Sequence, residues 1–391
     1  MAARRCHRRD PPSPLTEGHT DCESSSAAAF VRWLLVDATV ATHRRRSRRL
    51  PEGHPLASTV CPSSPGQCNE PRPQVARSGI VSHVRRFAMA LLIALGGGPA
   101  CTHVLRPYAN TSPPGPTETV RLTWLGTAGI AIDDGKSMVL LDPFVSRAPL
   151  RRVLSRRPVE VDHQAVARWW ERLAPGGREH VAVVVTHAHY DHSMDAPAFA
   201  QISGGQLYGS AVLVAQAHAG GFDPGRIHEV TGSDAIEVGG FRFTIFDSEH
   251  GGRRVFFPGE HPENFSIPAA ARDYKPGPVL TVLVEHGSRR VLHHASAGWA
   301  PGMYDGVGPV DLVLLGAAGH ADNQTDRYLA AVPLAVEARH VAPIHYDNFF
   351  GRLDPRPAAL PGVKLRRLVH ALEDHALSVV SLPLGETRAL P

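Results

Sequence analysis

Three histidines and one aspartate fall within six residues, in the stretch 187–192, which reads His187-Ala-His189-Tyr-Asp191-His192. Neutral imidazole and carboxylate are natural ligands of zinc and similar divalent ions. The stretch follows a short β-branched apolar run, 181–185, which predicts a buried strand. A strand that ends in a loop rich in His and Asp predicts a metal site; the alternative is a solvated turn without function.

The spacing of these four residues resembles the His-x-His-x-Asp-His signature of the metallo-β-lactamase superfamily. The strings 124–129, 141–144 and 343–346 resemble one branch of it, which includes L-ascorbate-6-phosphate lactonase and N-acyl-phosphatidylethanolamine-hydrolysing phospholipase D. The resemblance covers residues 119–350. It implies an α/β fold, the four-layer αββα sandwich in which two sheets pack face to face with helices outside.

The resemblance also implies two metal sites built at strand ends. It places the third and the last histidine ligands at His250 and His345, each after an apolar run. One metal would then have His187, His189 and His250 as ligands, and a second would have Asp191, His192 and His345. Zinc suits these ligands, and manganese and iron are alternatives. Asp191 would bind metal and also orient the attacking metal-bound hydroxide or handle its proton.

Several further residues are candidates near the site. Asp142 resembles an acid that hydrogen-bonds a ligand ring or the metal loop, and an Asp capping the turn before Pro143 is the alternative. Ser296 stands where the superfamily has an Asp that bridges two metals, so we expect a weaker second metal or a single one. His294, just upstream with His293, is a candidate replacement ligand, as is Asp305. His320 would face substrate or lie on the surface.

Short strands with helices between them must position these residues. A hairpin is predicted from Val120–Ile132, with its turn at 126–129, and a third strand over 137–141. A helix is predicted over 162–173, capped by Asp162, and another over 325–337, interrupted at Pro333. The other predicted strands are the region around Leu213, 227–230, 235–238, 241–246, 279–284, 290–293, 311–315 and 340–344.

Charge and cysteine content divide the chain near residue 100. Residues 1–100 carry 14 Arg or Lys and 7 Asp or Glu, whereas the other 291 residues carry 27 and 30. The main domain is therefore mildly acidic, which argues against a nucleic-acid partner. All five cysteines lie in the first 101 residues, so metal ligands in the main domain must be His and carboxylate.

Four segments are predicted along the chain. Residues 1–80, rich in Arg, Pro and Ser, read as a disordered or mis-annotated extension. Residues 81–101 resemble a signal peptide, with a basic pair, an apolar core of nine residues and a small-residue stretch ending at Cys101. Residues 102–118 read as a Pro-rich tether. Residues 119–391 form the hydrolase domain.

These predictions give an exported bacterial lipoprotein anchored in the membrane through a lipidated Cys101; cytoplasmic residence is the alternative. The chain would hydrolyse an ester, lactone or phosphodiester, with a small molecule or a phospholipid as substrate. A metal-binding protein of the same fold with weak or no hydrolase activity, because of Ser296, is the alternative function. The sequence leaves the substrate, the number of metals and the oligomeric state open.

Overall fold

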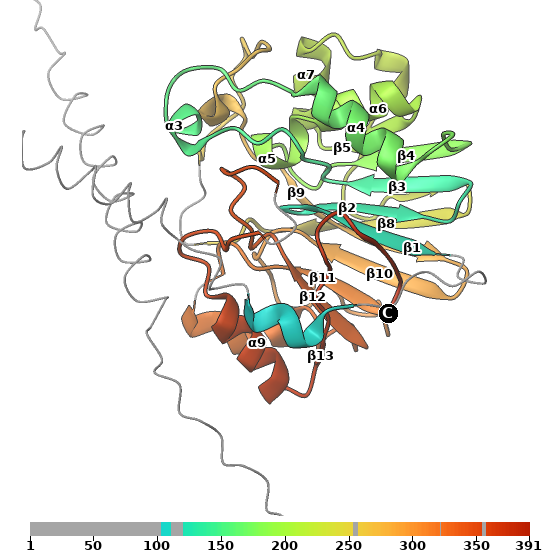
Figure 1. Cartoon of the computed structure of the whole chain (residues 1–391), viewed down its shortest axis with the longest axis vertical. Helices are drawn as coiled ribbons and strands as arrows, with labels where there is room; N and C mark the ends of the chain where they lie inside the picture. The colour runs from blue at the N-terminus through green and yellow to red at the C-terminus, as the bar shows by residue number, and fades with distance from the viewer. Residues whose placement is uncertain (1–102, 111–119, 253–256, 321, 354–356) are drawn as a thin grey trace, which may run out of the picture.

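The computed structural model describes residues 103–110, 120–252, 257–320, 322–353 and 357–391. Two seven-stranded sheets pack face to face, and helices cover their outer faces (Figure 1). The predicted four-layer αββα sandwich is therefore confirmed. The predicted segments 1–80 and 81–101, including Cys101, lie outside the described residues.

The first sheet has the strand order β14-β1-β2-β3-β4-β5-β6. The predicted hairpin is confirmed, since β1 (Arg121–Gly126) pairs with β2 (Gly129–Asp133) up to the pair Gly126 and Gly129. From β3 (Ser137–Leu141) to β6 the pairing is parallel. The other strands are β4 (His180–Val184), β5 (Gln206–Gly209), β6 (Ile227–Glu229) and β14 (Thr387–Ala389). Parallel strands covered on both faces read as continuous apolar runs, as 181–185 does.

Helices cover the outer face of this first sheet (Figure 1). The predicted cap of α4 (His163–Leu173) is present, because the Asp162 carboxylate accepts a hydrogen bond from the Ala165 N–H. The other helices here are α3 (Leu150–Val153), α5 (Tyr190–Ser193), α6 (Ala196–Ser203) and α7 (Ala211–Ala219). The strand predicted around Leu213 is wrong: Leu213 lies in α7, and a short run of apolar residues does not by itself distinguish a buried helix face from a strand.

The second sheet has the order β13-β12-β11-β10-β9-β8-β7. Its predicted hairpin is confirmed as β9 (Val279–His286) with β10 (Arg289–His294). The remaining strands are β7 (Ala235–Val238), β8 (Phe241–Ser248), β11 (Leu312–Gly316), β12 (His340–Ile344) and β13 (Ser378–Val379). Helix α8 (Thr325–Ala331) ends before Pro333, which has no backbone N–H to continue it. Helix α9 (Leu365–Asp374) covers this sheet.

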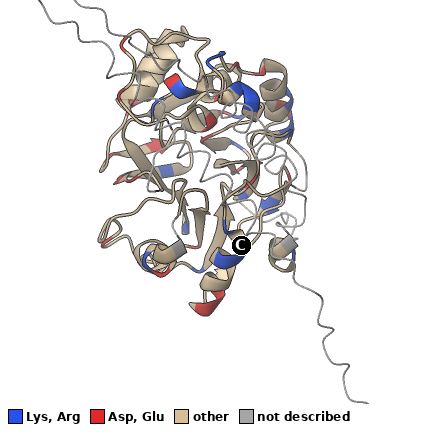
Figure 2. Ribbon diagram, turned by 90° about the vertical axis from the view of Figure 1, so that its left-hand side faces the viewer, with Lys and Arg blue, Asp and Glu red and all other residues tan. Residues whose placement is uncertain are grey.

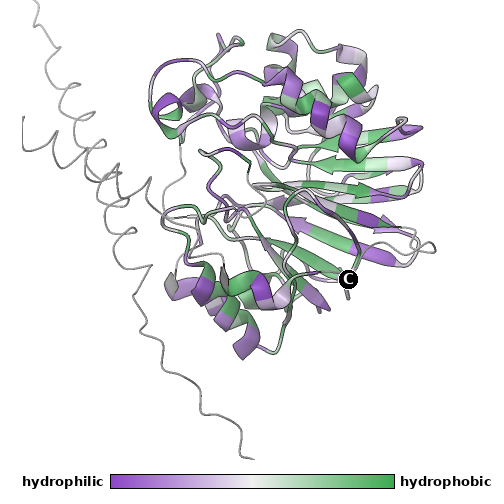
Figure 3. Cartoon of the chain, viewed as in Figure 1, coloured by the Kyte–Doolittle hydropathy of each residue, from purple (hydrophilic) through white to green (hydrophobic). Residues whose placement is uncertain are grey.

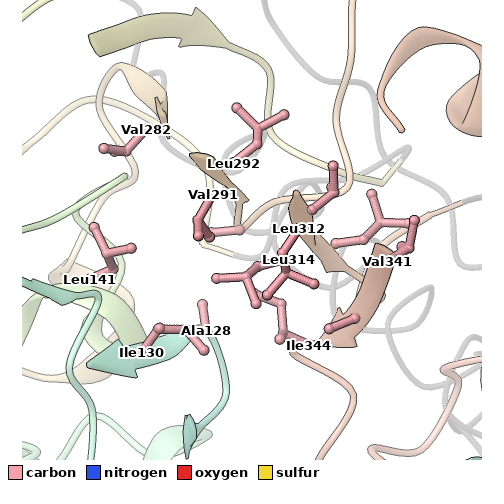
Figure 4. Packing of buried hydrophobic residues seen from close by; sticks show 14 of the residues in the cluster. Ala128, Ile130, Leu141, Val282, Val291, Leu292, Leu312, Leu314, Val341 and Ile344 are labelled. Atoms are coloured by element: carbon pink, nitrogen blue, oxygen red, sulfur yellow. The ribbon is translucent and has the colours of Figure 1, made fainter. Parts of the chain in front are cut away.

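The core lies between the two sheets. Leu141 of the first sheet and Val282 and Leu314 of the second belong to one cluster of buried apolar side chains, and each is fully buried (Figure 4). The strands are accordingly mostly apolar, whereas the outer helices expose a polar face (Figure 3). Burying an aliphatic side chain of this size contributes about 1.5–3 kcal/mol, so this layer holds the two sheets together.

The segment before the domain differs from the predicted tether over its first part. Residues His103–Tyr108 form the 3-10 helix η2, which lies beside α9 (Figure 1), and Leu105 is buried. Ala109 bridges to Ser381, and the Asn110 N–H donates to the Ser381 carbonyl. The prediction of an extended 102–118 is thus corrected for 103–110, because its apolar residues find a place on the core. Residues 111–118 lie outside the described part.

Lys and Arg (blue) and Asp and Glu (red) are interspersed over the ribbon in the view of Figure 2. Among the described helices, none is long and apolar enough to span a bilayer.

Candidate metal centre

The loop after β4 carries the His-rich stretch and is held on both sides. The Thr186 N–H donates to Asp142 at the end of β3, and the Ala188 N–H donates to the Pro276 carbonyl before β9. Helix α5 begins at Tyr190, directly after His189. The loop is therefore anchored to the first sheet at the end of β3 and to the second sheet just before β9. Its imidazole rings lie close together.

The structure brings all six predicted ligands together in two groups. His250 follows β8 and His345 follows β12, so each reaches the loop from the second sheet. Within each group the potential ligand atoms lie within 4.8 Å of one another; the groups are His187, His189 and His250, and Asp191, His192 and His345. All of these residues except His250 are buried. The imidazole rings of His187 and His192 lie 3.9 Å apart, so the two groups adjoin.

The ring nitrogens in these groups fit a bound cation. The His250 Nδ1–H donates to the Gly251 carbonyl, which leaves its Nε2 facing His189 Nδ1 at 3.2 Å. In the same way His192 Nδ1 donates to Asp142, and its Nε2 faces His345 Nε2 at 3.1 Å. Ring nitrogens whose other nitrogen is already engaged, converging beside a carboxylate, form a donor set suited to a divalent metal.

The protonation of the centre follows from burial and mutual charge. Burial, followed by repulsion from the neighbouring imidazoles, lowers the pKa of His187 well below its ordinary value. Burial alone would raise the pKa of Asp191, but the surrounding histidines outweigh it and hold that pKa low. An imidazole that is neutral and a carboxylate that is ionised at pH 7 are the forms that bind metal.

Asp142 orients the loop through both of its oxygens. Oδ1 accepts from the Thr186 N–H at 2.7 Å, and Oδ2 accepts from the Thr186 hydroxyl and from His192 Nδ1 at 2.8 Å. Asp142 is fully buried, and its φ is 43°, in the left-handed region that few non-glycine residues adopt. It fixes the ring of His192 and the start of the loop together, which the turn-capping alternative does not require.

We expect Asp142→Asn to weaken metal binding by about 10–100-fold, because the amide has only one acceptor oxygen and would turn its NH2 group toward either the Thr186 N–H or His192 Nδ1. The dissociation constant would be measured by competition with a chelator. Asp311→Asn is the matched control, since Asp311 is a buried, ion-paired acid of the second sheet that lies in neither ligand group. Equal affinities for wild type and Asp142→Asn would contradict the orienting role.

His345 is held by contacts that the sequence pattern did not reveal. Its φ is 55°, and its N–H donates to the Thr127 carbonyl. Two residues on, Asp347 accepts from the Thr127 N–H at 2.7 Å and from Arg147 at 2.9 Å. The Arg147–Asp347 ion pair is buried and ties the loop after β3 to the loop after β12. The side chain of His345 therefore sits on a rigid support.

One cavity, of about 240 Å³, opens onto both groups. Its other lining residues are either small or large and mostly apolar. They are Gly251, Gly252, Ala295, Ser296, Ala318 and Gly319, and Tyr190, Phe257, Phe349, Phe350 and Leu360. A substrate that enters this cavity meets the potential ligand atoms directly.

The profile of the β-lactamase superfamily domain matches residues 138–347, more than half of the chain. The chain belongs to the metallo-β-lactamase superfamily. It is 26% identical over 232 residues to a UPF0173 metal-dependent hydrolase of Thermus thermophilus, covering 59% of this chain and 85% of that protein. It is 23% identical over 230 residues to a UPF0173 protein of Pyrococcus furiosus, with the same two coverages.

Two solved structures are similar to this superfamily member over about two thirds of its length. Igni18, a metallo hydrolase of Ignicoccus hospitalis, is 17% identical, with a TM-score of 0.40, and covers 68% of this chain and 97% of its own. The metallo-β-lactamase fold protein YhfI of Bacillus subtilis is 13% identical, with a TM-score of 0.44, and covers 69% and 99%.

Ser296, which the family resemblance matches to a bridging Asp, lines the cavity. Its hydroxyl accepts a hydrogen bond from the Gly251 N–H at 2.8 Å, and Ser296 is 8% exposed. The turn is packed tightly: a Cβ on Gly298 would lie 2.1 Å from the Glu249 carbonyl oxygen. Ser296 therefore holds the backbone beside His250. Within the described residues, no carboxylate belongs to both ligand groups.

The replacement ligands considered for Ser296 lie elsewhere. His293 hydrogen-bonds the Ala128 carbonyl, and His294 hydrogen-bonds the Tyr304 hydroxyl at 2.7 Å. Burial lowers the pKa of His294 to about 3, so this ring is a neutral part of the second sheet. Asp305 is exposed in a turn. His320 contacts the Ala317 carbonyl and stacks on Tyr328, outside the cavity wall. The placements predicted for His294 and His320 beside the centre are thus corrected.

Asp195, at the start of α6, supports the same region. Its Oδ2 accepts from the N–H groups of Val145 and Ser146, both at 2.7 Å. Its Oδ1 is buried and has no hydrogen-bond partner among the described residues. Burial raises the pKa of Asp195 to about 6. The two hydrogen bonds favour the charged form and act in the opposite direction, but burial outweighs them.

A raised carboxyl pKa predicts that the protein loses stability as the pH rises. The native state holds the proton of Asp195 up to about pH 6, whereas the unfolded chain releases it near pH 4, so the contribution is complete below pH ~4 and lost above pH ~6. We expect the unfolding free energy of wild type to fall by about 2–3 kcal/mol relative to Asp195→Asn across this window. Denaturant titrations at several pH values would measure it. Parallel pH curves for the two proteins would contradict it.

Proposed function

We propose that the chain is a metal-dependent hydrolase with two adjoining metal sites. The observation that carries the proposal is the convergence of two ligand groups, from the ends of three separate strands, on one cavity. The names of relatives support it, since several UPF0173 proteins similar to this chain are called metal-dependent hydrolases. One site would use His187, His189 and His250, and the other Asp191, His192 and His345.

Zinc is the metal we propose, with manganese and iron as alternatives. The donors are imidazole nitrogens and one carboxylate, a set that zinc binds readily and that suits the other two ions as well. All cysteines of the sequence lie at or before residue 101, so a thiolate site that selects softer ions does not arise in the domain. Loading with each ion separately distinguishes the three.

A bound divalent ion polarises the bond under attack and lowers the pKa of water. The chain's residues then have distinct tasks. Asp191 is buried and ionised, and its Oδ2 lies 3.5 Å from His345 Nε2 and 3.8 Å from His192 Nε2. It would orient the attacking water and take up its proton. Asp142 fixes the ring of His192, and the walls of the cavity limit the access of other water molecules.

We propose an ester, a lactone or a phosphodiester, including a phospholipid, as the substrate. Each of these presents a polarised centre to a nucleophilic water, and the fold alone does not choose among them. Ser296 favours a second candidate function, a metal-binding protein of the same fold with weak or no turnover. Both functions share the ligand groups and differ in turnover.

The test uses the full chain loaded with zinc and assayed on an ester, a lactone and a phosphodiester. The hydrolase proposal expects turnover of at least one class, lost on chelation and restored by metal. Bound metal without turnover of any class would favour the second candidate function. A chain that takes up no metal under any loading would overturn both.

We also propose that the protein is an exported lipoprotein, on the sequence pattern that ends at Cys101. Growth of an expressing bacterium with labelled palmitate should label the protein, and Cys101→Ala should remove the label. A protein that is unlabelled and recovered from the cytoplasm would overturn this proposal.

A further inference from the structure

Part of the cavity wall beside the ligand groups is apolar and is built from separate parts of the chain. Phe349 and Phe350 follow β12, and their rings lie 4.6 Å apart. Phe349 also packs edge-on against His345 at 5.6 Å and lies 6.5 Å from Tyr190. Leu360 reaches the same wall because its N–H donates to the Tyr346 carbonyl, which folds the loop back.

These side chains leave apolar surface facing the cavity. Phe257, Phe350 and Leu360 are half-buried, whereas Phe349 and Tyr190 are buried behind them. They join one apolar cluster that includes Phe144 and Tyr274 and lies apart from the core between the sheets. An apolar surface inside a cavity gains free energy when an apolar ligand group covers it.

The described lining offers little to a charged substrate. It contains no Lys or Arg, and its polar side chains outside the ligand groups are Ser296 and Tyr190. The Ser296 hydroxyl is engaged by Gly251, and the Tyr190 hydroxyl is buried. Within the described residues, the lining outside the ligand groups therefore offers a substrate mainly apolar contacts. Residues 253–256, between the lining residues Gly252 and Phe257, lie outside the described part.

The cavity volume limits the size of the group. A cavity of about 150 Å³ is known to hold benzene. The volume here is about 240 Å³ and must also hold the reacting centre beside the ligand groups. There is room for one aromatic ring, or a branched alkyl group of that size, together with the bond to be broken.

We propose that the cavity accepts an uncharged acyl group of aromatic-ring size, carried by a carboxylic ester or lactone. This inference rests on the proposed hydrolase function and deepens it. In the reaction a water oxygen bonds to the acyl carbon and the bond from that carbon to the alcohol oxygen breaks. One water proton goes to the leaving alcohol, and the other stays on the product acid, which releases it on ionising to the carboxylate.

The test compares acyl groups on a constant leaving group. The full chain, loaded with zinc, is assayed with 4-nitrophenyl acetate, butanoate and phenylacetate and with bis(4-nitrophenyl) phosphate. We expect kcat/KM for phenylacetate to exceed that for acetate by about tenfold or more. Phe350→Ala and, independently, Leu360→Ala should bring this ratio towards one. Circular dichroism checks that each variant is folded.

Phe265→Ala is the matched control. Phe265 is an aromatic residue of the same apolar cluster that packs on Tyr274 and does not line the cavity. Its substitution should leave the phenylacetate-to-acetate ratio at the wild-type value. A ratio that is near one in wild type, or that Phe350→Ala does not change, would overturn the inference while leaving the hydrolase function in place. So would a higher kcat/KM for the phosphodiester than for phenylacetate.

A binding measurement separates this inference from the hydrolase function. Saturation-transfer NMR with benzyl alcohol, on the metal-free full chain, reports whether an aromatic ring binds without any reaction. Binding that Phe350→Ala weakens and Phe265→Ala does not would support the ring site even if no ester is turned over. An absence of binding to the wild-type protein, together with an absence of turnover, would overturn it.

Discussion

Replacing His187 with alanine is expected to lower kcat/KM for any ester substrate by at least about 10³-fold. His187 is 2% exposed, and its ring lies within 5.0 Å of the rings of His189, His192 and His250. It thus stands between the two ligand groups, and its loss opens the first and disturbs the second. Metal assistance is worth several kcal/mol in the transition state, and each 1.4 kcal/mol is about tenfold in rate.

A matched control distinguishes the effect of removing a proposed metal ligand from the effect of removing any histidine. His228 lies on β6, is exposed, and stacks on Tyr208. His228→Ala should keep the wild-type rate. Metal content, measured by elemental mass spectrometry, should fall in His187→Ala and not in the control. Wild-type turnover in His187→Ala would show that hydrolysis takes place elsewhere in the protein.

The features predicted correctly from the sequence are those that depend on residues close together in the chain. The apolar run 181–185 and the His-rich stretch after it are contiguous, so a strand leading into a ligand loop followed from a few residues. The hairpin of β1 and β2, the cap at Asp162 and the break at Pro333 have equally local causes. The placement of His250 and His345 came instead from the family resemblance, because a single His after a strand carries no such signal.

Contacts between distant residues could not be predicted. Arg147 and Asp347 are 200 residues apart, and Asp195 reaches back about 50 residues to Val145 and Ser146. Such pairs depend on the order of strands in the sheets, which no local pattern encodes. The error at Leu213 has a related cause, since a run of Ala, Val and Leu suits a buried helix as well as a strand. The apolar cavity wall likewise combines side chains from three separate loops.

We expect Ser296→Asp to tighten the second metal by at least about tenfold. Unit charges 4 Å apart repel by about 4 kcal/mol at an effective dielectric constant of about 20, and a shared carboxylate offsets part of this cost between two cations. In the described structure of the wild-type protein, no carboxylate belongs to both ligand groups. The second metal ion should therefore bind more weakly than the first. An Asp at this position can still accept from the Gly251 N–H, as the Ser296 hydroxyl does.

Metal content per chain at buffered free zinc, by elemental mass spectrometry, would measure the effect. Ser296→Asn is the matched control, because it has nearly the size of Asp without its charge. One metal in wild type and in Ser296→Asn, and two in Ser296→Asp, is the expected result. Two metals of equal affinity in wild type would show that another group replaces the bridge.

Turnover of the same three proteins then separates the two roles that Ser296 can have. If Ser296→Asp gains both metal and rate, the missing carboxylate limits the natural centre. If it gains metal while Ser296→Asn and Ser296→Asp both lose rate, the serine itself matters, because it lines the cavity and the larger Asp and Asn side chains take up space there. The second result would make the serine part of a working site, and the weak-activity alternative would lose the observation that favours it.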